Sequence, residues 1–198
     1  MTNLTKFLFL VFGIQGSGKS YHCTRYCESN SSASYLGTGQ LIRNNPILRQ
    51  KVMNGNYLSD EEIYPIVIAE INQFCANSLK RILLLDGFPR SIAQYSFLLR
   101  EFGLDRCLKI LPLILYLDEN SATSRVLQRG REDDKLEVLK LRYQLYRQNV
   151  MPMIQMLTFN HFIKPINTAE EKDLVHKKFS QEINKHLEQK QENLITNS

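Results

Sequence analysis

Gly13-Ile14-Gln15-Gly16-Ser17-Gly18-Lys19-Ser20 is the stretch of this sequence that decides the fold. It follows directly on the apolar run at residues 7–12, which has the length and composition of a buried strand. A buried strand, a glycine-rich turn and a helix in this order place backbone N–H groups and the positive end of a helix around an anion. The spacing G-x-x-x-x-G-K-[ST] is typical of a loop that binds nucleotide phosphates. The stretch therefore predicts binding of ATP or GTP.

The composition is typical of a globular protein with a full core. The 198 residues are 43 % hydrophobic and 23 % charged, which is enough to fold as one domain without disulfides or a structural metal. The net charge of +5 is spread along the chain, so nucleic acid is not an expected partner. The four cysteines contain no C-x-x-C pair, which is the spacing of many zinc sites. The apolar runs are too short to span a membrane, so we expect a cytoplasmic protein with no membrane partner.

Short apolar runs alternate with helical patterns along the chain. Strands are predicted at residues 7–12, 34–37, 81–86, 111–117 and 162–166. Between them, Ser59 and Glu62 form a capping box, which predicts a helix start. Near the C-terminus, residues 175–187 carry one apolar stripe at helical spacing, and the polar residues from Gln189 onward are expected to fray. The alternation predicts an α/β fold of the P-loop NTPase type, a doubly wound five-stranded parallel sheet flanked by helices.

The strand predicted at residues 81–86 brings a carboxylate to the edge of the sheet where the phosphate loop lies. Asp86 directly follows Leu83-Leu84-Leu85. A carboxylate in this place commonly holds Mg²⁺ through water molecules, because Mg²⁺ loses its waters reluctantly and bridges phosphate oxygens. Ser20 supplies the hydroxyl that the general loop pattern directs to Mg²⁺. We therefore expect Mg²⁺ as cofactor, held by Ser20 and Asp86 largely through waters.

Three further segments carry recognisable motifs. Residues 86–94 read D-G-F-P-R-S-I-A-Q, and residues 36–43 read L-G-T-G-Q-L-I-R. Residues 125–134 read R-V-L-Q-R-G-R-E-D-D and are followed by L-R-Y at 141–143. Each segment resembles a motif of the adenylate kinase family. Residues 86–94 resemble its signature D-G-F-P-R-x-x-x-Q, residues 36–43 resemble its S-T-G-D-x-L-R segment, and residues 125–143 resemble its lid and the helix after it. The chain thus resembles a P-loop nucleoside monophosphate kinase of the short-lid type.

The resemblance implies a monomeric enzyme that transfers the γ-phosphoryl group of Mg·ATP to AMP by direct in-line transfer, giving two ADP. It implies one kinase domain over residues 1–198, with a nucleoside-monophosphate-binding insertion at 37–67 and a short lid at 125–135. By the same resemblance, ATP would be bound by Gly13, Gln15, Gly16, Ser17, Gly18, Lys19, Ser20, Tyr21, Arg125 and Arg129. AMP would be bound by Thr38, Arg43, Leu58, Gly87, Phe88, Arg90, Gln94, Arg131 and Arg142. The catalytic residues would be Lys19, Arg90, Arg129, Arg131 and Arg142.

The chemistry of phosphoryl transfer independently favours this use of arginine. Two anions react in such a site, so several positive charges must face them where water is excluded. Arginine is a permanently charged planar fork that binds phosphate through two N–H groups at once. Arg125 and Arg129 are four residues apart and therefore share one face of a helix.

The acceptor base is indicated by fewer residues. Gln94 and Thr38 match the AMP-binding version of the motifs, and a glutamine amide can donate and accept at once, as an adenine edge requires. A UMP/CMP kinase of the same fold is the alternative, since such kinases tend to carry Asn and Ala at these positions. Gln15 replaces a proline, Gln40 replaces an aspartate, and Tyr21 brings a bulky ring toward the nucleotide. The last two departures favour a second alternative, a weakly catalytic adenine-nucleotide sensor or scaffold protein.

Overall fold

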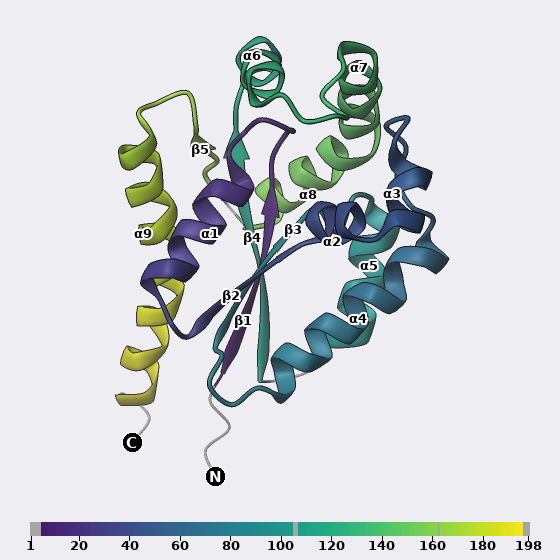
Figure 1. Ribbon diagram of the computed structural model, residues 1–198. Helices are drawn as coiled ribbons and strands as arrows, with labels where there is room; N and C mark the ends of the chain where they lie inside the picture. The colour runs from purple at the N-terminus through teal and green to yellow at the C-terminus, as the bar shows by residue number, and fades with distance from the viewer. Residues whose placement is uncertain (1–4, 105–106, 162, 196–198) are drawn as a thin grey trace.

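The computed structural model describes residues 5–104, 107–161 and 163–195 of the chain. Five parallel strands form one sheet in the order β2-β3-β1-β4-β5 (Figure 1). Their bounds are β1 Lys6–Phe12, β2 Ala33–Gly37, β3 Ile82–Asp86, β4 Leu108–Tyr116 and β5 Ile166–Asn167. The order places β1 and β3 at the centre of the sheet, with β4 on the other side of β1. The predicted α/β fold, a doubly wound five-stranded parallel sheet of the P-loop NTPase type, is confirmed.

Helices pack on both faces of the sheet (Figure 1). One face is covered by α1 (Lys19–Ser29) and α9 (Lys172–Ile195), and the other by α4 (Asp60–Ala76), α5 (Ile92–Phe102) and α8 (Met151–His161). The remaining helical segments are α2 Thr38–Asn44, α3 Pro46–Val52, α6 Glu119–Arg129, α7 Leu136–Leu145 and the π-helical turn η1 Tyr146–Val150. Within the described ranges, no helix combines the length and the apolar composition that a membrane span requires.

Strand β1 shows why both faces are apolar. Successive side chains of a strand point to opposite faces. Phe7, Phe9 and Val11 therefore pack with α1 and α9, whereas their neighbours Leu8 and Leu10 pack with the helices of the other face. A strand covered on both sides needs apolar residues at every position, which is why the run at 7–12 reads as continuous rather than alternating.

The strand predictions were close for four strands and wrong for the last. Residue 162 lies outside the described residues, α8 ends at His161, and only Ile166 and Asn167 pair with β4. Pro165 lacks an N–H group and cannot contribute a donor to the ladder, so the pairing begins after it. Strand β4 begins three residues earlier than predicted, because Leu108 already pairs with Lys6.

Two helix predictions are confirmed. The Glu62 carboxylate accepts a hydrogen bond from the Ser59 N–H at 3.0 Å, which closes the capping box at the start of α4. The apolar stripe of α9 packs on the sheet, and Val175 and Phe179 are fully buried. The helix continues to Ile195, and the fraying expected from Gln189 onward stays a prediction.

A third, smaller core joins the top of the sheet to α6 and α7 (Figure 1). It consists of Ile14, Leu117, Ala122, Val126, Leu139 and Tyr143. Ile14 belongs to the glycine-rich loop, so the same apolar contacts that hold α6 and α7 also hold that loop. The loop and these two helices therefore meet at the carboxyl ends of the strands, where ligands of parallel sheets bind.

Candidate active site

The glycine-rich loop has a conformation that only glycine supports. Gly16 and Gly18 have φ angles of 96° and 86°, in the left-handed region. A Cβ atom on Gly16 would lie 2.6 Å from the carbonyl oxygen of Ala122, so a side chain there would also collide with α6. Helix α1 begins at Lys19, directly after the loop. The loop and the N-terminus of α1 together have the geometry that binds anions, and binding of a phosphate there stays a prediction.

Lys19 brings a positive charge to this loop. Its Nζ donates to the carbonyl oxygens of Gly13 at 2.7 Å and Ile14 at 3.1 Å, and lies 3.9 Å from Asp86 Oδ1. Burial lowers the pKa of Lys19 from its ordinary value, while the Asp86 carboxylate acts in the opposite direction. The ammonium is thus held at the mouth of the loop between backbone oxygens and a carboxylate.

The Asp86 carboxylate forms a second centre beside the loop. Ser20 Oγ donates to Asp86 Oδ2 at 2.9 Å, and the Tyr35 hydroxyl donates to the same oxygen at 3.3 Å. Burial raises the pKa of Tyr35 well above its usual range, so this hydroxyl keeps its proton at neutral pH. Carboxylate and hydroxyl oxygens are hard ligands of the kind that Mg²⁺ prefers. Ser20 and Asp86 therefore fit Mg²⁺, and no cluster of three acidic, histidine or cysteine side chains suited to a metal occurs among the described residues.

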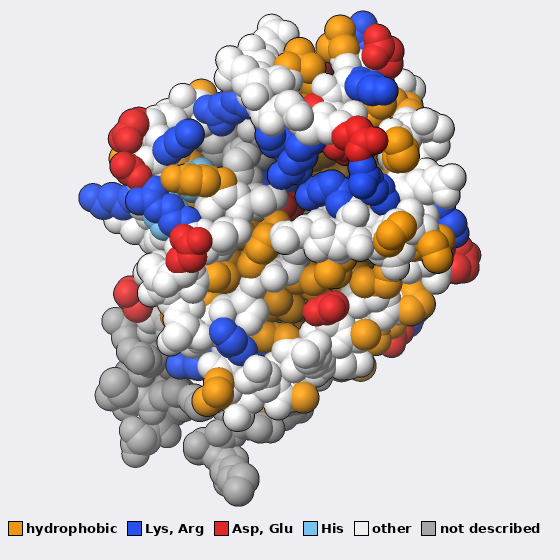
Figure 2. All heavy atoms as spheres, in the orientation of Figure 1, with side chains coloured by type: hydrophobic (Ala, Val, Ile, Leu, Met, Phe, Trp, Pro, Cys, Tyr) orange, Lys and Arg blue, Asp and Glu red, His pale blue; other side chains and the backbone are white. Residues whose placement is uncertain are grey.

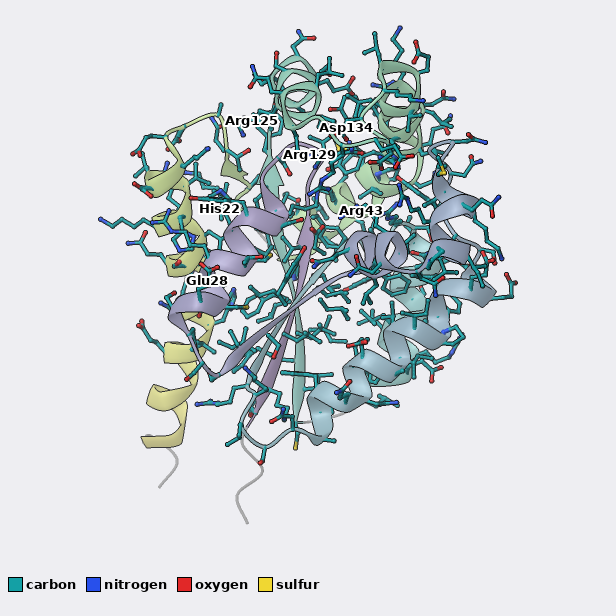
Figure 3. All side chains as sticks on the ribbon, in the orientation of Figure 1. His22, Glu28, Arg43, Arg125, Arg129 and Asp134 are labelled. Carbon is teal, nitrogen blue, oxygen red and sulfur yellow. The ribbon has the colours of Figure 1, made fainter. Side chains whose placement is uncertain are left out.

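Arg129, at the end of α6, is held by a buried carboxylate (Figure 3). Its Nε and Nη2 atoms lie 2.9 Å and 2.6 Å from the two oxygens of Asp134, whose side chain is 1 % exposed. The Arg131 N–H donates to the same carboxylate at 3.0 Å. A two-pronged pair of this kind fixes the plane of the guanidinium. Arg125, one turn earlier on the same helix, donates from Nη2 to the carbonyl oxygen of Thr168 at 2.8 Å.

Arg142 on α7 has a similar arrangement. Its Nη2 lies 2.8 Å from Asp133 Oδ2, and its Nη1 donates to the Gln15 side chain at 3.2 Å. Burial would raise the pKa of Asp133, but the hydrogen bond and charge of Arg142, together with a backbone hydrogen bond and Arg43, outweigh it, so the pKa is lowered overall. Gln15 also donates from Nε2 to Asp134 at 3.4 Å. Gln15 therefore links the phosphate loop to Asp134 directly and to Asp133 only through Arg142.

Arg90 lies in the segment between β3 and α5. Its Nε donates to the carbonyl oxygen of Gly87 at 2.7 Å, and its guanidinium lies 4.3 Å from the centre of the Tyr57 ring. Burial lowers the pKa of Arg90, although a guanidinium remains charged at neutral pH. Gly87 has a φ of 90°, and a Cβ there would lie 2.4 Å from Thr38 Oγ1, so only glycine allows this turn between β3 and α5.

These residues line one continuous cleft of about 1450 Å³. Figure 2 shows Lys and Arg side chains gathered in a hollow between the α6–α7 region and α2, from which Arg43 projects (Figure 3). Of the predicted site residues, the cleft is lined by Gly13, Gln15, Gly16, Gly18, Lys19, Ser20, Tyr21, Thr38, Arg43, Leu58, Asp86, Gly87, Phe88, Arg90, Gln94, Arg125, Arg129, Arg131 and Arg142. Ser17 is the exception, because its side chain is fully buried beneath the loop.

Several residues that hold this site were not assigned a role from the sequence, among them two tyrosines and two aspartates. Tyr35 and Tyr57 contact Asp86 and Arg90 through the fold alone, and no local pattern marks them. Asp133 and Asp134 do have a signal, because they end a run of three adjacent acids that follows three arginines within ten residues. Paired charges of opposite sign in a short segment favour ion pairs, and both acids indeed bind arginines of the cleft.

Comparison with known proteins places the chain among nucleotide-binding enzymes. A family model described as an AAA domain matches residues 12–140. An adenylate kinase of Synechococcus sp. (strain WH7803) is 34 % identical over 73 % of this chain and 81 % of its own length. An adenylate kinase of Parasynechococcus marenigrum (strain WH8102) is 32 % identical over 76 % of this chain and 82 % of its own length. One of Helicobacter pylori (strain HPAG1) is 30 % identical over 86 % and 94 %, respectively.

Proposed function

The chain belongs to the adenylate kinase family and is a nucleoside monophosphate kinase, and we propose that it transfers the γ-phosphoryl group of ATP to AMP, giving two ADP. One observation carries the proposal: a phosphate loop and a cluster of arginines face each other across a single cleft. The cleft volume of about 1450 Å³ exceeds the roughly 300–1000 Å³ of a site for one small ligand. A cleft of that size and charge suits two nucleotides bound end to end.

On the donor side, we assign the ATP phosphates to residues 13–20 with Lys19. Backbone N–H groups at a helix N-terminus bind phosphate oxygens, and the lysine adds a full charge. Arg125 and Arg129 extend from α6 over the same end of the cleft and would cover ATP. Tyr21 is half-exposed on α1 in the cleft wall, where its ring is open to the nucleotide.

On the acceptor side, we assign the AMP phosphate to the arginines that face the loop. Arg90 and Arg142 would hold it from opposite walls, with Arg43 and Arg131 beside them. Thr38, Leu58, Gly87, Phe88 and Gln94 would enclose the nucleoside. The segments 37–67 and 125–135, proposed as acceptor insertion and short lid, carry several of these side chains.

Mg²⁺ is the proposed cofactor, and Ser20 and Asp86 are the residues that would hold it, largely through waters. The ion would supply positive charge that neutralises part of the phosphate charge. The chain's own contribution is to place donor and acceptor in line and to surround the transferred group with Lys19 and the arginines. No covalent enzyme intermediate is required. We propose that the protein acts in this way as a monomer in the cytoplasm.

A coupled assay with Mg·ATP and AMP, CMP, UMP or dAMP tests the proposal. We expect the highest kcat/KM for AMP. Higher values for UMP or CMP would make the protein a pyrimidine nucleotide kinase. Tight binding of ATP and AMP with negligible turnover would instead favour a sensor or scaffold protein, which the departures at Gln40 and Tyr21 suggest. A reaction lacking the acceptor provides the background rate of ATP hydrolysis.

A further inference from the structure

The side-chain amide of Gln94 is hydrogen-bonded at both ends. Gln94 is buried at the start of α5, where its Oε1 accepts from the Arg90 N–H at 2.7 Å. Its Nε2 donates to Asp60 Oδ1 at 2.8 Å. Asp60 itself lies behind Gln94, outside the group of described residues that line the cleft. It therefore acts on the cleft through Gln94 rather than by direct contact with a ligand.

Asp60 is held firmly in this position. It is the first residue of α4, and its second oxygen accepts from the Tyr64 hydroxyl at 2.8 Å. The Tyr64 ring stacks on Phe97 with 3.8 Å between ring centres and packs edge-on against the buried Phe88. Burial, with the neighbouring carboxylate, raises the pKa of Tyr64 to about 12, so the hydroxyl donates at all physiological pH values. Both oxygens of Asp60 are thus engaged by donors.

The two partners of Gln94 allow only one orientation of its amide. A backbone N–H can only donate, and a carboxylate can only accept. If the amide turned over, its NH₂ group would face the Arg90 N–H, and its oxygen would face the Asp60 carboxylate. Two part-buried contacts between like groups would replace two hydrogen bonds, which is unfavourable. A glutamine that could otherwise turn over is therefore locked.

The lock decides which base edges the amide can match. One N–H and one lone pair of Gln94 remain for a ligand, in fixed positions. Adenine offers a ring-nitrogen acceptor beside an amino donor, and cytosine offers the same pair. Hypoxanthine and uracil offer the reverse pair, a ring N–H beside an oxo acceptor. A free amide would turn over to match either pattern, whereas a locked amide matches one.

We propose that Asp60 is a positioning residue that determines acceptor specificity: by locking Gln94, it makes the site select bases with an amino group at this edge over bases with an oxo group. The inference rests on the proposed function in one respect, the assignment of Gln94 to the acceptor base. It goes beyond that function, because the selecting element is the Asp60–Gln94 pair rather than Gln94 alone.

AMP and IMP provide the sharpest test, because they differ only at this edge of the base. We expect the wild-type protein to prefer AMP over IMP by about 10- to 100-fold in kcat/KM, the discrimination typical of one two-pronged base contact. In Asp60→Ala the ratio should fall by about tenfold, since turning the amide over to accept IMP then costs one hydrogen bond instead of two, although the Arg90 N–H still opposes the turn. Asp60→Asn, which keeps an oxygen for Gln94, should retain the ratio within about threefold. If Asp60 had only a structural role, its loss would lower kcat/KM for AMP and for IMP equally and leave their ratio unchanged.

Glu61→Ala is the matched control. It removes the same charge from the same turn of α4 without touching Gln94, so the AMP to IMP ratio should stay within twofold. Tyr64→Phe frees one oxygen of Asp60 and should lower the ratio by about threefold; this variant decides the matter if Asp60→Ala does not fold.

Calorimetric binding of AMP and IMP to the same variants separates the two proposals. Discrimination in binding that Asp60→Ala weakens by about tenfold supports the inference even if AMP is not phosphorylated. Normal AMP turnover with an unchanged ratio in Asp60→Ala overturns it and leaves the proposed function intact.

Discussion

The phosphate loop and the arginine-rich segment face each other across the cleft, but they are held in place by different forces. Residues 13–20 take their shape from the backbone: glycines in the left-handed region and a turn in which the Ser17 N–H donates to the Ile14 carbonyl oxygen at 3.1 Å. Residues 125–142 are organised by side-chain ion pairs, Arg129 with Asp134 and Arg142 with Asp133. One wall of the cleft is fixed by chain geometry and the other by charge.

The difference matters for binding phosphate. The N–H groups of the loop and of the first turn of α1 need no rearrangement to meet an anion. Arg129 and Arg142, in contrast, already direct N–H groups to carboxylates. A phosphate that binds these arginines competes with those carboxylates or shares the guanidinium with them. We therefore expect the loop wall to be preorganised and the arginine wall to adjust when nucleotides bind.

The largest effect should come from the loop wall. Lys19→Met keeps much of the length of the side chain but removes the positive charge that lies against the loop. We expect kcat to fall by about three orders of magnitude or more, because this charge is proposed to stabilise the transferred group. Thermal unfolding should change little, which separates the chemistry from the fold. Turnover within tenfold of wild type would show that the loop is not the donor site.

On the arginine wall, the buried carboxylate should matter more than its neighbour. Asp134→Ala leaves Arg129 and the Arg131 N–H without their shared partner, and we expect the free energy of unfolding to fall by about 3 kcal/mol. Asp133→Asn removes charge from a more exposed site and should lower stability by less than half as much. Urea unfolding of both variants makes the comparison. Equal losses would mean that burial does not distinguish the two pairs.

Replacing an arginine by lysine probes the geometry of the same wall. Arg142→Lys and Arg90→Lys keep the charge but lose the two-pronged fork, so each should lose about 2 to 3 kcal/mol of transition-state stabilisation. The loss should appear in kcat/KM for AMP, while binding of a fluorescent ATP analogue stays within a few-fold. If ATP binding falls and AMP binding does not, these arginines belong to the donor half of the cleft.

The elements of the fold differ in how far the sequence alone predicts them. The loop, Asp86 and strands β1 to β3 were predictable because each depends on a local pattern. The short strand β5 was not, because its two residues are set by pairing with Leu115 and Tyr116, about fifty positions away. The start of β5 is set by Pro165, which cannot donate to the ladder, rather than by the apolar run around it.

For the site, the sequence indicated which residues line the cleft but not what holds them. Nearly all predicted residues do line it, although their individual roles stay predictions. The contacts of Tyr35 with Asp86, Tyr57 with Arg90 and Asp60 with Gln94 join residues that are about thirty to fifty positions apart. Such pairs follow from tertiary packing, and no periodicity or short motif contains them.

The two walls should lose stability in different ranges of acid pH, because their titrating groups have different pKa values. Burial, with His176 and two arginines nearby, lowers the pKa of His22 on α1 to about 4. A histidine whose folded pKa is lowered stabilises the fold above its unfolded pKa of about 6.5, and this contribution is lost as pH falls toward 4. From pH 7 to pH 5 the loss is about 2 kcal/mol. The lowered pKa of Asp133 gives stability that disappears only as pH falls below its usual value of about 3.8.

His22→Gln tests this assignment. The variant lacks a group that titrates between pH 4 and 6.5, so its unfolding free energy should fall less steeply over that range than that of the wild type. Urea unfolding at pH 7, 6 and 5 provides the slope, and His186→Gln on α9 serves as a histidine control with a smaller expected change. Parallel curves for His22→Gln and the wild type would show that His22 is not the group responsible.

The smallest effect should come from a pair that links the proposed acceptor insertion to the proposed lid across the surface. Arg49 on α3 binds Glu132 in the turn after α6, and both side chains are largely exposed, at 46 % and 64 %. In water such a pair gains little, because solvent screens the charges and both side chains lose freedom. We expect Arg49→Ala to change the free energy of unfolding by less than about 0.5 kcal/mol, and a double-mutant cycle with Glu132→Ala to give a similarly small coupling. The matched cycle for Arg129 and Asp134 should give a coupling several times larger. Equal couplings would mean that burial does not set the strength of ion pairs on this wall.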